Sequence, residues 1–315
     1  MSGRPLAITV GVDLGGTGTR VVALDADGVI VHRHSRPTPF GAAGAVEALI
    51  GSITATGPGL RGVGIGASGP VDRHGIIQNA ETLPAFSGIR LAPVISERLG
   101  VPCVIDNDAA AAAIGEHAYG AGRSSAGLLI ITLGTGVGVA ALTGGRPFRG
   151  ADGAHPEAGH ILVCGPPAPC YCGLPVCWEQ LASRTALDQL ADSAGQGVDA
   201  LADRARGGEA AAAQVFDTYG RRVGTGLVTL LAIFRPDRVV VAGGAARFLD
   251  LFGDGLRRSL DRSPKYSPKP AVVAAELGDL SGAIGAAVLA RPSPVSTGAA
   301  VRRGSRPGGG PDSEH

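Results

Sequence analysis

The sequence has little lysine, few aromatic residues and little net charge, and each shortage excludes a class of protein. Its only lysines are Lys265 and Lys269, which lie in a proline-rich segment. The nucleotide-binding P-loop, G-x-x-x-x-G-K-[ST], needs a lysine after its glycines, so this chain has no P-loop. Aromatic residues make up 4% of the chain, and the formal net charge is +1. This balance gives no electrostatic reason to expect a nucleic acid or a membrane surface as a partner.

Long apolar runs are also lacking. No run reaches the roughly 18 residues that a membrane-spanning helix needs, and the opening residues MSGRPLAITV lack the apolar core of a signal peptide. We therefore expect a cytoplasmic protein. Thiols stay reduced in that compartment, and the five cysteines are an odd number. Both points favour metal or redox chemistry over a disulfide framework.

The chain has enough apolar residues for a large core: 44% of its 315 residues are hydrophobic, which favours two domains over one. Strand-like and helix-like segments interleave throughout, which is typical of an α/β fold. We predict an N-terminal lobe over 1–118, a C-terminal lobe over 119–278, and a last helix within 279–290 that packs back on the N-terminal lobe. Residues 291–315, rich in Pro, Gly, Ser and Arg, predict a disordered tail.

Three predicted strands run into glycine turns, at 13–17, 133–136 and 242–244. The segments LGGTGTRVVAL (14–24) and LGTGVGVAAL (133–142) look like one motif used twice, which predicts two related halves facing a shared cleft. Glycines let backbone N–H groups approach an anion closely, and Asp13 could hold Mg²⁺ beside bound phosphates. Such turns also simply close hairpins, but three together, one with an acid, favour phosphate binding.

Asp108 lies where a predicted strand passes into an alanine-rich helix, in VIDNDAAAAAIGE. Aspartate is a good N-cap residue, so a purely structural role is one reading. A carboxylate at a strand end that faces a cleft can also accept a proton from an attacking hydroxyl. The segment alone leaves both roles open.

Three of the cysteines gather in CYCGLPVCWEQ, followed at once by the only tryptophan and by Glu179. Cys170, Cys172 and Cys177 could form a metal clip or a reactive thiol site, and the residues alone leave both open. A closed tetrahedral zinc site needs a fourth ligand, and both His160 and Cys164 are candidates. We interpret the isolated Cys103 as an ordinary buried cysteine.

Taken in order, DLGGTGT, IDNDAAAAAIGE, ITLGTGVG, EAGH, CYCGLPVCWE and VVVAGG resemble the ROK family of bacterial sugar kinases and repressors. The resemblance covers residues 7 to 290, and the cysteine cluster with its upstream histidine is its most specific part. It implies an actin- and hexokinase-like (ribonuclease H-like) ATPase fold with a cleft between two α/β lobes. It also implies ATP-dependent phosphorylation of a hexose at its 6-hydroxyl, with glucose as the first candidate and a homodimer or homotetramer as the assembly.

The resemblance assigns roles by position. Asp108 matches the general base. The matched sugar-binding residues are Asn107, Glu157, His160 and Glu179. The matched residues for ATP with its Mg²⁺ are Asp13, Gly15, Gly16, Thr17, Thr132, Gly134, Thr135, Gly136, Gly243 and Gly244. The implied ligands of a structural Zn²⁺ are His160, Cys170, Cys172 and Cys177.

The chain departs from the family pattern at four positions. Gly18 replaces the usual lysine, Ala110 an asparagine and Val176 a glycine, and Thr82 stands at an asparagine position of the sugar loop. The last departure makes a kinase for an amino or N-acylamino hexose the alternative. A ROK repressor would carry a helix-turn-helix domain before Asp13, for which we expect no room. A sugar-binding module without catalysis is a third reading, and the retained acids and Gly-Thr turns argue against it.

Overall fold

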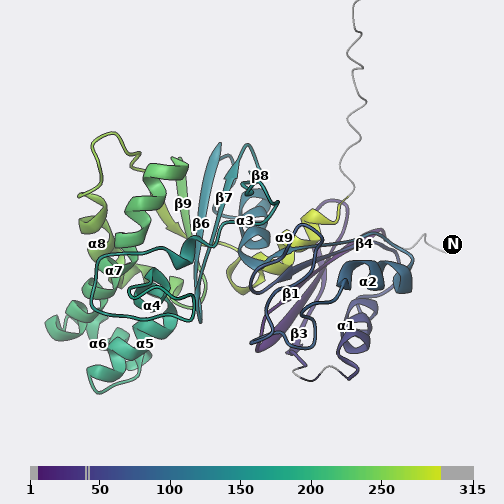
Figure 1. Ribbon diagram of the computed structural model, residues 1–315, viewed down its shortest axis with the longest axis horizontal. Coiled ribbons are helices and arrows are strands. Elements are labelled where there is room, and N and C mark those ends of the chain that lie inside the picture. Colours follow the sequence, from purple (N-terminus) through teal and green to yellow (C-terminus); the bar gives the residue numbers. More distant parts are fainter. Residues whose placement is uncertain (1–5, 40, 42, 292–315) are drawn as a thin grey trace, which may run out of the picture.

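The computed structural model describes residues 6–39, 41 and 43–291, so the predicted tail lies outside the described residues except for its first residue. Two five-stranded sheets form two lobes (Figure 1). The strands of the first sheet are β1 (Ile8–Leu14), β2 (Gly18–Leu24), β3 (Ile30–Pro37), β4 (Leu60–Ala67) and β5 (Cys103–Asn107). Their order is β3-β2-β1-β4-β5. The β1–β2–β3 meander is antiparallel, whereas β4 and β5 join in parallel.

The second sheet repeats this topology. Its strands are β6 (Gly127–Leu133), β7 (Val137–Thr143), β8 (Arg146–Pro147), β9 (Arg238–Ala242) and β10 (Ala271–Ala274). Their order, β10-β9-β6-β7-β8, matches the first sheet when β6 is set against β1. The predicted relation between the two halves is therefore visible in the strand order, and each half places a glycine turn after its first strand.

Helices cover both sheets. They are α1 (Ala45–Thr54), α2 (Leu91–Leu99), α3 (Asp108–Tyr119), α4 (Trp178–Ala182), α5 (Arg184–Ser193), α6 (Val198–Arg206), α7 (Ala210–Phe234), α8 (Leu249–Leu260) and α9 (Ser281–Leu289). Residues 184–234 form three helices, α5, α6 and α7, because glycines near 195–197 and 207–208 interrupt the helical run. The short elements α4 and β8 had no periodic signal in the sequence.

The last helix, α9, returns to the first lobe, and α3 and α9 lie between the two sheets (Figure 1). Its backbone approaches β1 and β4 so closely that only glycine fits there. A Cβ on Gly11 would lie 1.9 Å from the carbonyl oxygen of Ala283, and one on Gly64 would lie 1.7 Å from that of Ala286. These glycines let α9 pack directly on β1, which leads into the first turn, and on its neighbour β4.

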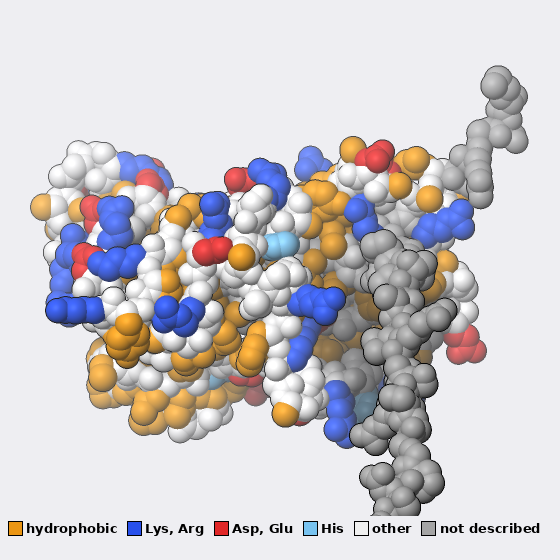
Figure 2. All heavy atoms as spheres, turned by 90° about the horizontal axis from the view of Figure 1, so that it is seen from above, with side chains coloured by type: hydrophobic (Ala, Val, Ile, Leu, Met, Phe, Trp, Pro, Cys, Tyr) orange, Lys and Arg blue, Asp and Glu red, His pale blue; other side chains and the backbone are white. Residues whose placement is uncertain are grey.

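Basic and acidic side chains are interspersed on the face drawn in Figure 2. Over the described residues, exposed ion pairs include Arg206 with Asp250 and Arg98 with Glu47. Pairs of this kind contribute little to stability. Within the described part of the chain, no helix is both long and apolar enough to cross a bilayer.

Candidate active site

The first glycine turn joins β1 to β2. The Gly15 N–H donates to the carbonyl of Gly18 over 3.1 Å, and the Thr38 hydroxyl donates to the carbonyl of Gly15 over 2.6 Å. A Cβ on Gly16 would lie 2.8 Å from the Cβ of Thr82. The predicted sugar loop therefore packs against the predicted phosphate turn, and Gly16 leaves the room for it. Thr17, the last residue of the turn, is exposed.

The second turn, between β6 and β7, is also closed by a backbone hydrogen bond, but it is one residue tighter. The Gly134 N–H donates to the carbonyl of Gly136 over 3.0 Å, and the carbonyl of Thr135 accepts the hydroxyl of Thr185. The third predicted turn lies directly against the second. Gly243 has a φ of 81°, and a Cβ there would be 2.7 Å from the backbone of Leu133. The structure thus places the predicted adenosine turn beside the second phosphate turn, as one nucleotide site requires.

The β6–β7 hairpin also reaches the first lobe. A Cβ on Gly138 would lie 2.4 Å from the hydroxyl oxygen of Thr132 and 3.0 Å from the Cβ of Ala109. Ala109 belongs to the first turn of α3, directly after Asp108. The second phosphate turn and the candidate base therefore meet where the two lobes touch.

The structure separates the two roles that the sequence left open for Asp108. Asn107 is the N-cap of α3: its side-chain oxygen accepts from the N–H groups of Ala109 and Ala110, and its amide donates to the carbonyl of Gly69. Asp108 follows as the first helical residue, and one of its oxygens accepts from Ala109 over 2.8 Å. Among the described residues, no further backbone N–H is paired with this carboxylate, because that of Ala110 goes to Asn107. The carboxylate is therefore not consumed by capping.

Two carboxyl groups in the cleft have raised pKa values. Burial, helped by the charge of Asp13, raises the pKa of Asp108 to about 7. Burial also raises the pKa of Asp13 to about 6, although Arg20 opposes this shift from 3.4 Å. A general base works best with a pKa near the working pH, and perturbed acids in a cleft are typical of functional sites.

The two predicted sugar carboxylates come from the second lobe. Glu179 is 8% exposed. One of its oxygens accepts the N–H of Val137, directly after the second turn, over 3.0 Å. The same oxygen lies 3.8 Å from Nε2 of His160. Glu157 is exposed, in the segment just before His160. A Cβ on Gly136 would lie 2.4 Å from the Glu179 carboxylate, so this acid touches the phosphate turn itself.

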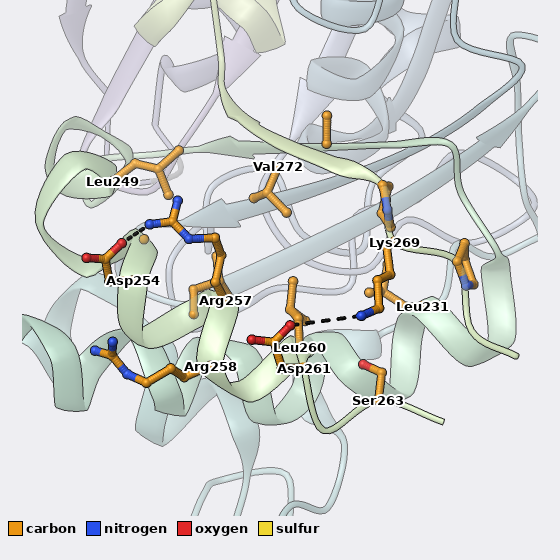
Figure 3. Close-up of a pocket in the computed structure, with 15 residues that line it drawn as sticks. Leu231, Leu249, Asp254, Arg257, Arg258, Leu260, Asp261, Ser263, Lys269 and Val272 are labelled. Carbon is orange, nitrogen blue, oxygen red and sulfur yellow. Dashed lines mark ion pairs between the residues drawn. The ribbon is translucent and has the colours of Figure 1, made fainter. Parts of the chain in front are cut away.

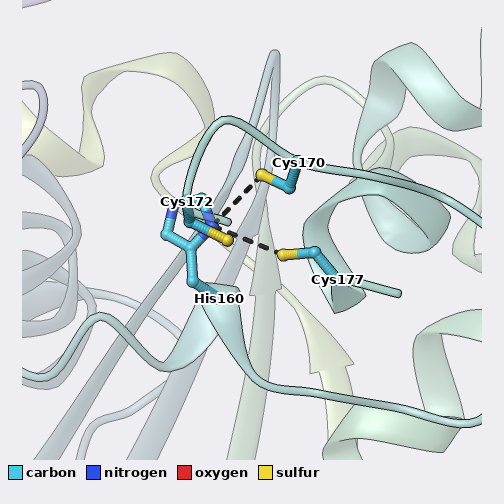
Figure 4. A group of neighbouring side chains, drawn as sticks. All are labelled: His160, Cys170, Cys172 and Cys177. Atoms are coloured by element: carbon cyan, nitrogen blue, oxygen red, sulfur yellow. Dashed lines mark hydrogen bonds between the residues drawn. The ribbon is translucent and has the colours of Figure 1, made fainter. Parts of the chain in front are cut away.

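The cysteine cluster forms as the spacing indicates. One nitrogen or sulfur atom from each of His160, Cys170, Cys172 and Cys177 lies within 4.8 Å of the others (Figure 4). His160 Nδ1 is 3.4 Å from the sulfur of Cys177 and 3.7 Å from that of Cys170. Tetrahedral zinc bonds of about 2.3 Å to sulfur and 2.1 Å to nitrogen would separate such atoms by about 3.6 Å. The donor set therefore fits zinc, and the exposed Cys164 lies outside it.

His160 has two predicted roles, zinc ligand and sugar binding, and its two ring nitrogens face different groups. Nδ1 faces the thiols, whereas Nε2 is 2.9 Å from the hydroxyl of Tyr171 and faces Glu179. With zinc on Nδ1, only Nε2 remains for a sugar hydroxyl. A metal bound to one ring nitrogen fixes the orientation of the whole imidazole ring, and with it the direction of the other nitrogen.

Sequence reasoning missed three side chains at the cleft, two arginines and a histidine. Arg20 lies opposite Asp13 in the β1–β2 register, a pairing that strand alternation across the first turn could have indicated. Arg149 and His155 follow β8 and reach the site from the second lobe. No local pattern pointed to them, because their partners lie elsewhere in the chain.

A cavity of about 610 Å³ lies away from this site, between α8 and the segment before β10 (Figure 3). Leu231, Leu256 and Val272 contribute apolar walls. Its rim carries ion pairs, among them Lys269 with Asp261 at 4.0 Å. None of the predicted site residues lines it, so this cavity is separate from the candidate site.

A sequence model of the ROK family matches residues 9–293. The chain belongs to the ROK family. It is 33% identical over 316 residues to a glucokinase of Streptomyces coelicolor. The aligned region covers 92% of this chain and 100% of that relative. The crystal structure of a ROK family glucokinase from Streptomyces griseus in complex with glucose and AMPPNP superposes with a TM-score of 0.78. That structure is 33% identical in sequence, over 90% of this chain and 99% of the other.

A third ROK relative has a different name. The bifunctional enzyme NanE/NanK of Brucella melitensis is 33% identical over 91% of this chain and 54% of its own length. Together the comparisons confirm the predicted family, the two-lobed hexokinase-like fold and the enzyme class. This ROK protein is an ATP-dependent sugar kinase.

Proposed function

We propose that the chain transfers the γ-phosphoryl group of ATP to the 6-hydroxyl of a hexose, with glucose as the preferred acceptor. The observation that carries this proposal is the Asp108 carboxylate, which is free of capping, has a raised pKa, and lies where both lobes meet. The Streptomyces coelicolor relative is a glucokinase, and the Streptomyces griseus structure contains glucose and AMPPNP.

In this mechanism Asp108 accepts the proton of the sugar hydroxyl as the oxygen attacks the γ-phosphorus in line. Backbone N–H groups of the turns at 15–17 and 134–136 hold the phosphates, and the turn at 243–244 holds the adenosine. Asn107, Glu157, His160 and Glu179 bind the other sugar hydroxyls. Asp13 would hold the Mg²⁺ that accompanies ATP and offsets phosphate charge; its carboxylate oxygens are ligands of the kind that Mg²⁺ prefers.

The zinc proposed for His160, Cys170, Cys172 and Cys177 has a structural role, because four protein ligands leave no open position. Cys177 is the N-cap residue of α4, and Glu179 lies in the first turn of that helix. A metal at this point would hold the helix start in place. The carboxylate of Glu179 is then positioned over the sugar by a rigid support.

The second candidate is a kinase for an amino or N-acylamino hexose. It is favoured by Thr82, whose hydroxyl is 2.6 Å from the side-chain nitrogen of Asn79, and which packs on Gly16. Thr82 therefore lies at the cleft rather than on a distant surface, so its departure from the family pattern can alter the acceptor. The NanE/NanK relative keeps this candidate open.

The proposal is tested by following ADP release with Mg-ATP and a panel of sugars. The panel holds glucose, mannose, glucosamine, N-acetylglucosamine, N-acetylmannosamine and 3-amino-3-deoxyglucose. We expect the highest kcat/KM with glucose. A preference for an amino or acylamino sugar would replace glucose by the second candidate and make the Thr82 loop the specificity loop. ADP release with none of the sugars would reject the proposed hexose acceptor.

The raised pKa of Asp108 predicts how activity depends on pH. Only the ionised carboxylate accepts a proton, so protonation inactivates the base. Because the pKa of this group is about 7, we expect kcat/KM for the sugar to fall about tenfold per pH unit on the acid side of neutrality. A nearby Mg²⁺ favours the ionised carboxylate, so it moves the fall in kcat/KM to lower pH. Flat activity from pH 8 to pH 5 would contradict the role of Asp108.

A further inference from the structure

An ion pair joins the two lobes next to the candidate base. Arg149 follows β8 in the second lobe, and Asp106 belongs to β5 in the first. The guanidinium of Arg149 contacts the Asp106 carboxylate, and both side chains are largely buried, at 29% and 12% exposure. Asp106 directly precedes Asn107 and Asp108. The ion pair therefore holds the strand end that carries the acceptor-side residues.

The same segment of the second lobe also supports Glu157. A tight turn at 150–154, with the Gly150 N–H donating to the carbonyl of Ala154 over 2.8 Å, turns the chain back after Arg149. It brings in His155, whose side chain is only 5% exposed, with Nε2 3.6 Å from Oε1 of Glu157. At 3.6 Å this is a packing contact rather than a hydrogen bond, and the buried imidazole limits the space open to the carboxylate on that side.

The charge states of Arg149, Asp106 and His155 are compatible with side chains held in fixed positions. Burial and the charge of Arg149 lower the pKa of His155 to about 4, so the imidazole is neutral at pH 7 and carries no charge toward Glu157. Arg149 is balanced by Asp106, so the buried cation is not left unpaired. Removing one partner of a partly buried pair costs more than the pair itself contributes, because the other charge remains desolvated.

We propose that Arg149 and His155 are positioning residues of the acceptor site. The ion pair between Arg149 and Asp106, which we call the clasp, holds the two lobes together, and His155 orients Glu157. The sugar-binding residues of both lobes are thereby held in place, so that one hydroxyl of the bound sugar faces Asp108. The inference rests on the proposed function for its kinetic consequence, but the ion pair between the lobes can be tested without any sugar. A small misplacement of reacting groups costs a large factor in rate, which is why a contact outside the reacting atoms matters.

The kinetic test compares Arg149→Met, His155→Ala and Asp106→Asn with the wild type. We expect the sugar KM to rise about tenfold or more and kcat to fall, while the ATP KM stays within about twofold. Arg149→Lys, which keeps the charge, should recover part of the loss. The matched control is Arg98→Met, which removes the exposed pair with Glu47 at 2.6 Å and should leave all three constants unchanged.

The double variant Asp106→Asn/Arg149→Met separates the pair from two independent effects. If the two side chains act through each other, the double variant should be no worse than the poorer single variant. Multiplied losses would reject the clasp. A lowered melting temperature with an unchanged sugar KM in Arg149→Met, Arg149→Lys and His155→Ala would show a merely structural role and overturn the proposal.

Hydrogen exchange tests the clasp without any sugar. In Arg149→Met we expect faster amide exchange at both 105–109 and 149–157 than in the wild type or in Arg98→Met. Unchanged exchange in both segments would overturn the clasp even in an active enzyme. Conversely, failure of the wild type to phosphorylate any sugar would reject the proposed function and leave this measurement to decide the clasp.

Discussion

Replacement of Asp108 by asparagine is expected to lower kcat by about 10²- to 10⁴-fold, the range that a general base contributes. Asparagine keeps the shape of the side chain but cannot accept the hydroxyl proton. Asn107, not Asp108, caps α3, so the change should leave the helix and the sugar dissociation constant nearly intact. Steady-state kinetics and calorimetric sugar titration measure the two quantities separately.

The control for this experiment is Asp261→Asn. Asp261 is an exposed acid at the end of α8, 4.0 Å from Lys269 and outside the candidate site. It should retain wild-type kcat. Turnover of Asp108→Asn close to that of the control would remove Asp108 from the mechanism, whatever its pKa.

Replacement of Cys177 by serine is expected to abolish zinc binding and to damage the sugar site with it. Cys177 is completely buried and directly precedes the helix that carries Glu179. We expect zinc content to fall from about one ion per chain to near zero, because a serine hydroxyl is a poor zinc ligand. The melting temperature should fall by roughly 5 °C or more, and the sugar KM should rise about tenfold as Glu179 loses its support.

Cys164→Ser is the matched control, since Cys164 is exposed, close in sequence and outside the cluster. It should keep its zinc, its melting temperature and its sugar KM. Metal analysis of both purified variants, with activity before and after chelation, gives the comparison. If Cys177→Ser kept one zinc per chain and Cys164→Ser lost it, the ligand set would be wrong.

Local patterns predicted the elements that carry the site. The repeated strand, glycine turn and strand indicated two related halves, and both sheets have the same strand order. This worked because β-branched alternation and glycine turns act over a few residues, within which backbone geometry is decided by the residues themselves. The cysteine spacing indicated a metal clip or a reactive thiol site for the same reason.

Contacts between distant segments could not be predicted in this way. From the sequence, Asp108 could either cap α3 or act as the general base. His160 and Cys164 were both candidates for the fourth zinc ligand. Packing decided the geometry in both cases: Asn107 took the cap, and the turn before Cys177 brought His160 within 3.4 Å of its sulfur. Each outcome depends on how two segments meet, which neither segment specifies alone.

The sequence by itself thus determined the α/β class, the glycine turns, the cysteine cluster and, through its motif order, the family. Only the tertiary structure decided which acids are free to react and which charged groups support them. Arg20 beside Asp13, and Arg149 across the lobes on Asp106, are examples. The reason is physical: turns and strands follow from short-range backbone preferences, whereas burial, pKa and ion pairing arise only when the two lobes and their helices pack together.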